Sequence, residues 1–127
     1  MRLRWMTILL LAALPACSPQ ADGQRYSVYF QPYSADLDQQ ALETVHAAAD
    51  FAQGHRGLPI AVVGYAAPPD PDRDVPGLSA HRADAVAQVL AASGVEANRV
   101  TTSGNGIIDP KTLPTVSVRR VDITVGR

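Results

Sequence analysis

One arginine in the C-terminal half of the chain, Arg82, has the residue type and the position to bind an anionic group. Apolar residues that recur at helical spacing place it in the first turn of a predicted helix. Free backbone N–H groups of a first turn favour an anion, and a guanidinium donates directed hydrogen bonds to a carboxylate. We therefore expect an anion-binding side chain that points into a site and contributes little core packing. The alternative is a surface arginine that is only solvated.

Three aspartates in a proline-rich segment raise the question of calcium binding. Asp70, Asp72 and Asp74 alternate as the first ligands of a calcium loop do. Val75 stands where such a loop needs glycine, however, and His81 where it needs the bidentate glutamate. We therefore expect three solvated carboxylates and no calcium site.

No catalytic constellation accompanies these residues. The sequence lacks a nucleophile elbow, a phosphate-binding loop and paired zinc-binding histidines, and its one cysteine lies near the N-terminus. His46 and His55 have no neighbours at zinc-ligand spacing, so we expect both at the surface. The sequence therefore predicts a protein that is not an enzyme and that needs no metal or other cofactor.

The N-terminus has the features of an export signal. Arg2 and Arg4 precede an apolar run over 6–14 that is too short to span a bilayer as a stable helix. The residues that follow, L-P-A-C over 14–17, resemble the lipobox of bacterial lipoproteins. We therefore expect a lipoprotein signal peptide over 1–16. The alternative is an ordinary secretory signal followed by an incidental cysteine.

Lipidation of Cys17 is the consequence of that lipobox. Several acyl chains on one cysteine give durable membrane anchoring. Ser18 follows the cysteine where lipoproteins held at the inner membrane often carry aspartate, so resemblance to that sorting rule favours the periplasmic face of the outer membrane. Residues 17–25 are polar and have no apolar period, which predicts a short tether.

Composition limits the rest of the chain to one small globular domain. The chain has 127 residues, of which 46% are hydrophobic and 18% charged, and its net charge is −1. Removing Arg2 and Arg4 with the signal peptide leaves nine basic against twelve acidic residues, a net charge of −3. No basic excess indicates nucleic acid as a partner.

Residues 26–127 alternate between strand and helix patterns. β-rich runs predict strands over 26–30, 58–65, 99–103 and 116–125. The second run is continuously apolar, which favours a strand buried on both faces. The glycines after residue 103 predict the end of the third strand, and the last strand changes parity at 119–120, where it either bulges or begins.

Two helices separate these strands. The first follows Asp36, a predicted N-cap with Gln39 reaching back, and ends near Gly54. The second follows Ser79 as N-cap and ends at Gly94, which is predicted to be left-handed. A short helical turn is possible over 109–113. The pattern predicts an α/β sandwich in which helices cover one face of a mixed four-stranded sheet.

Four segments, taken in order, resemble the C-terminal OmpA-like domain family, which includes the peptidoglycan-associated lipoprotein. They are L-S-A-H-R-A-D-A-V (78–86), S-G-V (93–95), N-R-V-T-T-S-G-N-G (98–106) and R-R-V-D-I (119–123). The resemblance extends from about residue 26 to the C-terminus. It implies the same α/β sandwich and a non-covalent binding of the peptide stem of peptidoglycan, without cleavage.

The resemblance also implies which residues bind. Diaminopimelate in the stem peptide presents a carboxylate and an ammonium, which the family binds with arginine and aspartate respectively. Arg82 matches the family's first arginine, and Arg119 and Arg120 match the pair at the last strand. The family's aspartate falls on Ala67, and its two asparagines fall on Val75 and Val118. The cationic half of the site is therefore present and the anionic half is missing.

Two functions remain open. The first is a lipid-anchored outer-membrane module that binds peptidoglycan and links the envelope to the cell wall. The second is a degenerate OmpA-like domain that kept the fold and binds another envelope protein. Loss of one partner of a partly buried charge pair typically costs several kcal/mol, which weakens binding by orders of magnitude.

Overall fold

The computed structural model describes residues 23–67, 77–107, 111 and 114–126. Its elements, in chain order, are β1 (Gln24–Tyr29), α1 (Gln39–Gly54), β2 (Ile60–Ala66), α2 (Leu78–Ala92), η1 (Ala97–Arg99), β3 (Val100–Ile107), η2 (Thr115–Val118) and β4 (Arg120–Val125). Cys17, the three alternating aspartates and nearly all of the possible turn over 109–113 lie outside the described residues.

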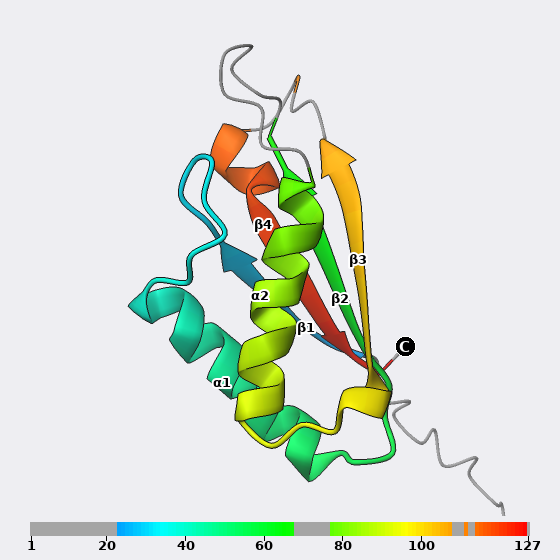
Figure 1. The fold of residues 1–127 in the computed structure, drawn as a ribbon. Helices are drawn as coiled ribbons and strands as arrows, with labels where there is room; N and C mark the ends of the chain where they lie inside the picture. Colours follow the sequence, from blue (N-terminus) through cyan, green and yellow to red (C-terminus); the bar gives the residue numbers. More distant parts are fainter. Residues whose placement is uncertain (1–22, 68–76, 108–110, 112–113, 127) are drawn as a thin grey trace, which may run out of the picture.

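The four strands form one mixed sheet in the order β1-β4-β2-β3. β4 pairs antiparallel with both β1 and β2, whereas β2 and β3 are parallel. Both helices lie on the same face of the sheet, as Figure 1 shows. This arrangement confirms the predicted α/β sandwich.

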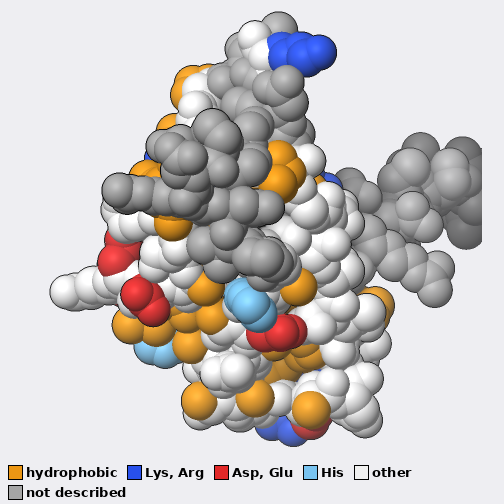
Figure 2. Space-filling view, turned by 45° about the horizontal axis from the view of Figure 1, so that its top comes forward, with side chains coloured by type: hydrophobic (Ala, Val, Ile, Leu, Met, Phe, Trp, Pro, Cys, Tyr) orange, Lys and Arg blue, Asp and Glu red, His pale blue; other side chains and the backbone are white. Residues whose placement is uncertain are grey.

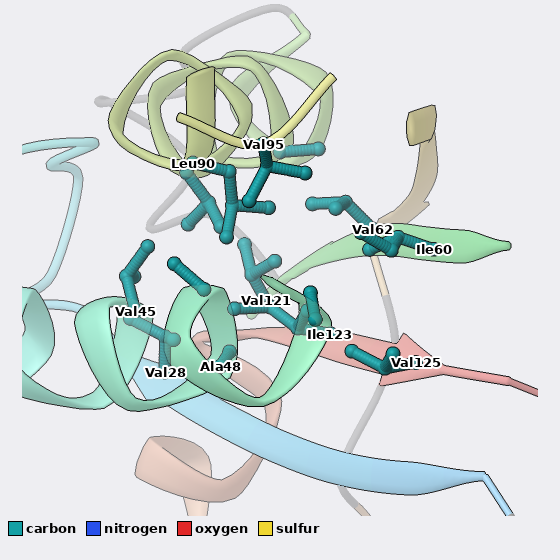
Figure 3. Close-up of a cluster of buried hydrophobic side chains, with 14 of the residues drawn as sticks. Val28, Val45, Ala48, Ile60, Val62, Leu90, Val95, Val121, Ile123 and Val125 are labelled. Atoms are coloured by element: carbon teal, nitrogen blue, oxygen red, sulfur yellow. The ribbon is translucent and has the colours of Figure 1, made fainter. Parts of the chain in front are cut away.

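The core lies between that face and the two helices. Alternate residues of β4 point toward the helices, and Val121, Ile123 and Val125 are completely buried there. Val45 of α1 and Leu90 of α2 meet them from the other side (Figure 3). Burial of one such side chain contributes about 1.5–3 kcal/mol, so this layer supplies most of the favourable free energy of folding.

β2 is buried on one face only, so the prediction of a strand buried on both faces was wrong. Ile60 and Val62 are buried in the core, but Ala61 between them is exposed. The reason is that helices cover only one side of this sheet. The apolar residues of β2 therefore alternate between the core and the open face.

The start of each helix differs from the prediction. Asp38, not Asp36, caps α1, and its Oδ1 accepts a hydrogen bond from the backbone N–H of Ala41 at 2.8 Å. The N–H of Asp36 instead donates to the Ser34 hydroxyl in the preceding turn. α2 begins after Gly77, which has φ 71° and provides no side-chain cap, so Ser79 is not the N-cap.

The end of α2 is as predicted. Gly94 has φ 94°, which favours glycine over any residue with a Cβ. Its N–H donates to Ala91, and the N–H of Val95 donates to Leu90 at 3.1 Å. These two bonds form a Schellman motif, which folds the buried Val95 back onto the helix end.

The bounds of every strand also differ by one to four residues from the prediction at one end or both. β1 begins at Gln24, two residues earlier than expected. β3 continues through the glycines to Ile107, with a register shift opposite Gly64 and Ala66, so the glycines form an irregularity in the strand and do not end it. β4 begins at Arg120, and only Arg119 separates it from η2, which identifies the parity change as the start of the strand.

Candidate functional site

The first turn of α2 lies directly on the backbone of β2 and β3. Gly64 and Gly104 are register partners in that strand pair. A Cβ on Gly64 would stand 1.9 Å from the Ser79 carbonyl oxygen, and one on Gly104 would stand 2.6 Å from the Ala80 nitrogen. The Ser79 hydroxyl accepts a hydrogen bond from the N–H of Gly106 at 2.9 Å. The hydrogen bond between Ser79 and Gly106 therefore holds the start of α2 on the sheet.

Arg82 is completely buried, with 0% of its surface exposed. Its Nε donates to the Ser34 carbonyl at 2.8 Å, its Nη1 to the Tyr65 carbonyl at 3.0 Å, and its Nη2 to the Gln31 carbonyl at 3.1 Å. The guanidinium also lies over the ring of Phe30, 5.2 Å from its centroid. Arg82 thus joins the turn after β1 to the end of β2.

This burial corrects two expectations for Arg82. It is not a solvated surface side chain, and its contribution to packing is not small. The reason is the tight seating of the first turn of α2, which directs this side chain into the gap between the 31–34 turn and β2. Whether the guanidinium also binds an anion depends on its remaining N–H groups.

Arg82 and Arg119 form a pair of cations. Burial, and then the positive charge of Arg119, lower the pKa of Arg82 to about 10. Arg119 donates from Nε to the Phe30 carbonyl at 3.4 Å, and its own carbonyl accepts from the Phe30 N–H at 2.8 Å. Within the described ranges, no carboxylate forms an ion pair with either arginine. This pair would attract an anion.

Arg120 lies apart from that pair, on the open face of the sheet. Its Nε contacts both carboxyl oxygens of Asp122 at 3.1 Å, and Asp122 also accepts from the Ser27 hydroxyl at 2.8 Å. The guanidinium lies over the ring of Tyr65, at 5.0 Å, and donates to the Ser117 carbonyl. The structure therefore brings together two of the three predicted arginines, Arg82 and Arg119, and separates Arg120 from them.

The turn that holds Arg82 was not predicted from the sequence. Ser34 donates from its N–H to the Gln31 carbonyl at 3.3 Å, and both residues accept from Arg82 through their carbonyl oxygens. Tyr33, between them, has φ 58°, an unusual conformation for a bulky residue. Backbone acceptors leave no sequence signal, although P-Y-S after the strand is typical of a turn.

The positions that depart from the family pattern are apolar here. Ala67 directly follows the last residue of β2, two residues after Tyr65. Val118 is buried in η2, with 2% of its surface exposed. Val75 lies outside the described residues. Position 67 therefore carries no acidic side chain that could bind an ammonium.

Metal binding and membrane spanning have no support in the described part of the chain. His46 and His55 are exposed, as predicted. No group of three histidine, cysteine or acidic side chains is placed to hold a metal among residues 23–67, 77–107, 111 and 114–126. Across the same residues, neither helix has the length and hydrophobicity needed to cross a bilayer.

Solved structures share this fold at low sequence identity. The peptidoglycan-associated lipoprotein of Burkholderia pseudomallei is 23% identical, with a TM-score of 0.67 over 79% of this chain and 89% of that chain. The periplasmic domain of Helicobacter pylori MotB is 22% identical, with a TM-score of 0.68 over 83% of each chain. The OmpA-like domain of FopA1 from Francisella tularensis is 19% identical, with a TM-score of 0.66 over 89% and 91%.

Comparison by sequence gives the family. No curated protein matches the chain. The model of the OmpA family matches residues 29–123, which include both helices, the buried Arg82, β2, β3 and most of β4. This chain belongs to the OmpA family.

Proposed function

We propose that this protein is an envelope module that binds peptidoglycan non-covalently through a carboxylate of the stem peptide. The observation that supports the proposal is the Arg82–Arg119 pair, which has no acidic partner among the described residues. One similar structure, from Burkholderia pseudomallei, is named a peptidoglycan-associated lipoprotein. The family of this chain and the charge of its site are consistent with the same class of ligand.

Arg82 has donors left for such a carboxylate. A guanidinium carries five N–H groups, and three of them donate to the carbonyls of Ser34, Tyr65 and Gln31. Each terminal nitrogen therefore keeps one further N–H that has no acceptor in the described part of the chain. Arg82 has no exposed surface in this structure, so a ligand would reach these N–H groups only after neighbouring groups move. A bound carboxylate would accept these donors and offset the repulsion from Arg119 that lowers the pKa of Arg82.

Arg119 is the second ligand-binding residue in this proposal, and Arg120 has a structural role. The side chain of Arg120 already has a carboxylate partner, Asp122, at 3.1 Å on the open face of the sheet. Arg119 has no such partner among the residues described, and its charge acts on Arg82. The resemblance implies both arginines, and the geometry favours Arg119.

The position of the site suits a protein held at a membrane by its N-terminus. Gln24 and Val125 pair at one end of β1, and Tyr29 and Arg120 pair at the other, next to Phe30 and the site. A strand of six residues is about 20 Å long, so the chain enters the domain at the end remote from Arg82. With lipid on Cys17 at the periplasmic face of the outer membrane, the site would face the cell wall.

Retention on purified peptidoglycan tests the proposed ligand. The wild type should sediment with the polymer, and Arg119→Gln should lose most of that retention while its melting temperature stays within a few degrees. Arg120→Gln serves as the matched control, because it removes an equal charge one residue away; it should retain binding if it folds. Equal retention by wild type and Arg119→Gln would exclude Arg119 from the site.

The proposed anchor needs a separate test. Cells that express the full chain should incorporate a fatty-acid analogue into the wild type and not into Cys17→Ser. Membrane fractionation of the two proteins then reports whether the lipid holds the domain at the outer membrane. Equal labelling of both proteins would contradict lipidation at Cys17, whatever the outcome of the sedimentation assay.

A second candidate function is supported by the residue at position 67. Alanine there provides no charge for an ammonium, so the domain would bind a protein of the envelope instead of the cell wall. If the wild type fails to sediment with peptidoglycan, and Ala67→Asp gains no retention, this second function is the better one.

A further inference from the structure

The exposed apolar side chains of the described residues gather at one end of the sheet. They are Tyr29 (51% exposed), Tyr33 (40%), Ile107 (50%) and Val116 (47%). Figure 2, which brings the top of Figure 1 forward, shows hydrophobic side chains on that end of the molecule. The end is the one at which Arg82 and Arg119 lie.

Each of these residues is a chain neighbour, a hydrogen-bond partner or a strand partner of a residue close to the cation pair. Tyr29 precedes Phe30, whose ring lies under Arg82. Val116 accepts from the N–H of Arg119 through its carbonyl, at 3.2 Å. Ile107 is the register partner of Ala66, which follows Tyr65, and the Tyr65 carbonyl accepts a hydrogen bond from Arg82. Tyr33 precedes Ser34, whose carbonyl also accepts a hydrogen bond from Arg82.

Tyr33 is the most informative of the four. It is the one residue other than glycine with positive φ in the described ranges, at 58°. The carbonyls on either side of it, those of Gln31 and Ser34, both accept hydrogen bonds from Arg82. A glycine would adopt this conformation with less strain. A bulky aromatic residue in a strained and partly exposed position, between two carbonyls that bind Arg82, indicates that its side chain has a use there.

We propose that Tyr33 is a ligand-contacting residue of the Arg82–Arg119 site, and that its ring packs on the apolar part of the ligand next to the carboxylate. The two arginines set the charge of the ligand, and Tyr33 and Val116 set the apolar character of its neighbouring atoms. The ligand class is therefore a carboxylate carried on an aliphatic chain or on a small apolar residue. This inference rests on the proposed function for the existence of the anion site.

The alternative role of Tyr33 is structural. In that role its left-handed backbone only aims two carbonyls at Arg82, and the ring has no contact with a ligand. The two roles make different predictions for carboxylates of different apolar content. A change in Arg82 geometry would affect every carboxylate alike, whereas loss of a ring contact would affect only those with an apolar chain.

The test uses two probes and follows the Arg82 Nε–H signal by NMR during titration. Pimelate carries its carboxylates on an aliphatic chain, whereas formate is a carboxylate without any chain. The wild type should bind pimelate more tightly than formate, and Tyr33→Gly should lose about tenfold in pimelate affinity with formate unchanged. Tyr33→Gly should fold, because glycine suits φ 58°. Tyr33→Phe should keep the preference for pimelate.

The matched control is His55→Ala, which removes an exposed ring from the end of α1, away from the site. It should leave both affinities unchanged. The proposal is overturned if the wild type shows no preference for pimelate, if Tyr33→Gly keeps the preference, or if both affinities fall together. Failure of the wild type to sediment with peptidoglycan would overturn the proposed function alone, since a Tyr33-dependent preference for pimelate would still support the ring contact.

Discussion

Gly64 of β2 and Gly104 of β3 lie opposite each other in the parallel strand pair, and together they make room for the first turn of α2. Neither glycine is needed for its φ, since neither has a positive value. Each is needed because a Cβ would collide with the backbone of Ser79 or Ala80. This contact fixes the helix that carries Arg82, so two small residues on the sheet determine where the cation lies.

Alanine at either glycine should therefore destabilise the protein. Gly64→Ala places a Cβ 1.9 Å from a carbonyl oxygen, and overpacking of this kind costs about 1–3 kcal/mol or more. Urea denaturation followed by circular dichroism would measure the loss. Gly54→Ala is the matched control, because nothing lies within 4 Å of its Cβ position and it ends a helix. A Gly64→Ala protein as stable as wild type would contradict this close seating of α2 on the sheet.

Arg82→Ala should also unfold the domain more easily, contrary to expectation from the sequence alone. Removing the guanidinium leaves the carbonyls of Gln31, Ser34 and Tyr65 without this donor, and each buried acceptor left unpaired costs about 1–3 kcal/mol. Relief of the repulsion from Arg119 offsets part of this cost. We expect a net loss of about 3 kcal/mol in the free energy of unfolding, measured in urea.

Arg56→Ala is the control for loss of an arginine. Arg56 forms a surface ion pair with Glu96 at 3.4 Å, and its side chain is 75% exposed. Such pairs contribute about 0–1 kcal/mol, so this variant should be nearly as stable as wild type. If Arg82→Ala and Arg56→Ala lose equal stability, Arg82 does not hold the turn after β1.

The contrast between these arginines shows where sequence patterns suffice. Alternation along the strands and helical spacing along 39–53 predict the layers of the fold, because burial of apolar side chains follows those periods. The burial of Arg82 was not predictable in that way. Its three acceptors are backbone carbonyls, and every residue type carries one. Family resemblance predicted a binding role for Arg82, which stays a prediction, and it did not predict the surroundings of that residue.

Capping residues show a second limit of the sequence. Asp36 and Asp38 are equally good N-caps by residue type, and the helix uses Asp38, whereas Asp36 belongs to the preceding turn, where its N–H donates to the Ser34 hydroxyl. Ser79 has the residue type of a cap but bonds Gly106 on a strand 27 residues away. In both cases the residue type suits a cap, but the structure uses the residue in a contact outside the helix.

The acid stability of the domain should depend on Glu96. The hydrogen bond from Arg99, at 3.0 Å, lowers the pKa of Glu96 below its ordinary value of 4.5. A carboxylate with a lowered pKa in the folded state adds stability above its unfolded pKa, and that stability is lost as the pH falls through the folded pKa. Glu96→Gln should therefore be less stable than wild type at neutral pH, and the difference should vanish in acid.

Thermal melts of both proteins across the range from about pH 7 to about pH 3 would measure this difference. Arg99 also donates to the carbonyls of Ala52 and His55 at the end of α1, so protonation of Glu96 would loosen that helix end first. Glu43→Gln on the exposed face of α1 is the control. A constant difference between wild type and Glu96→Gln at every pH would exclude the Arg99–Glu96 pair as its cause.

Ala67→Asp should strengthen retention on peptidoglycan, because it restores an acidic side chain at the end of β2. Position 67 lies two residues beyond Tyr65, whose carbonyl holds Arg82, so the new carboxylate would lie at the border of the cation pair. There it would bind the ammonium that accompanies the ligand carboxylate in diaminopimelate. A restored charge partner of this kind contributes several kcal/mol at most. We expect a gain of about tenfold in retention, which corresponds to about 1.4 kcal/mol.

Ala67→Asn separates charge from shape in this experiment. It has nearly the same size as aspartate and no charge, so it should gain nothing. Free diaminopimelate should compete with the polymer more effectively for Ala67→Asp than for wild type, whereas pimelate, which lacks the ammonium, should compete equally for both. If asparagine and aspartate give equal gains, or if pimelate and diaminopimelate compete alike, the new carboxylate does not bind an ammonium. The absence of an acidic residue at position 67 would then not be what limits binding to the cell wall.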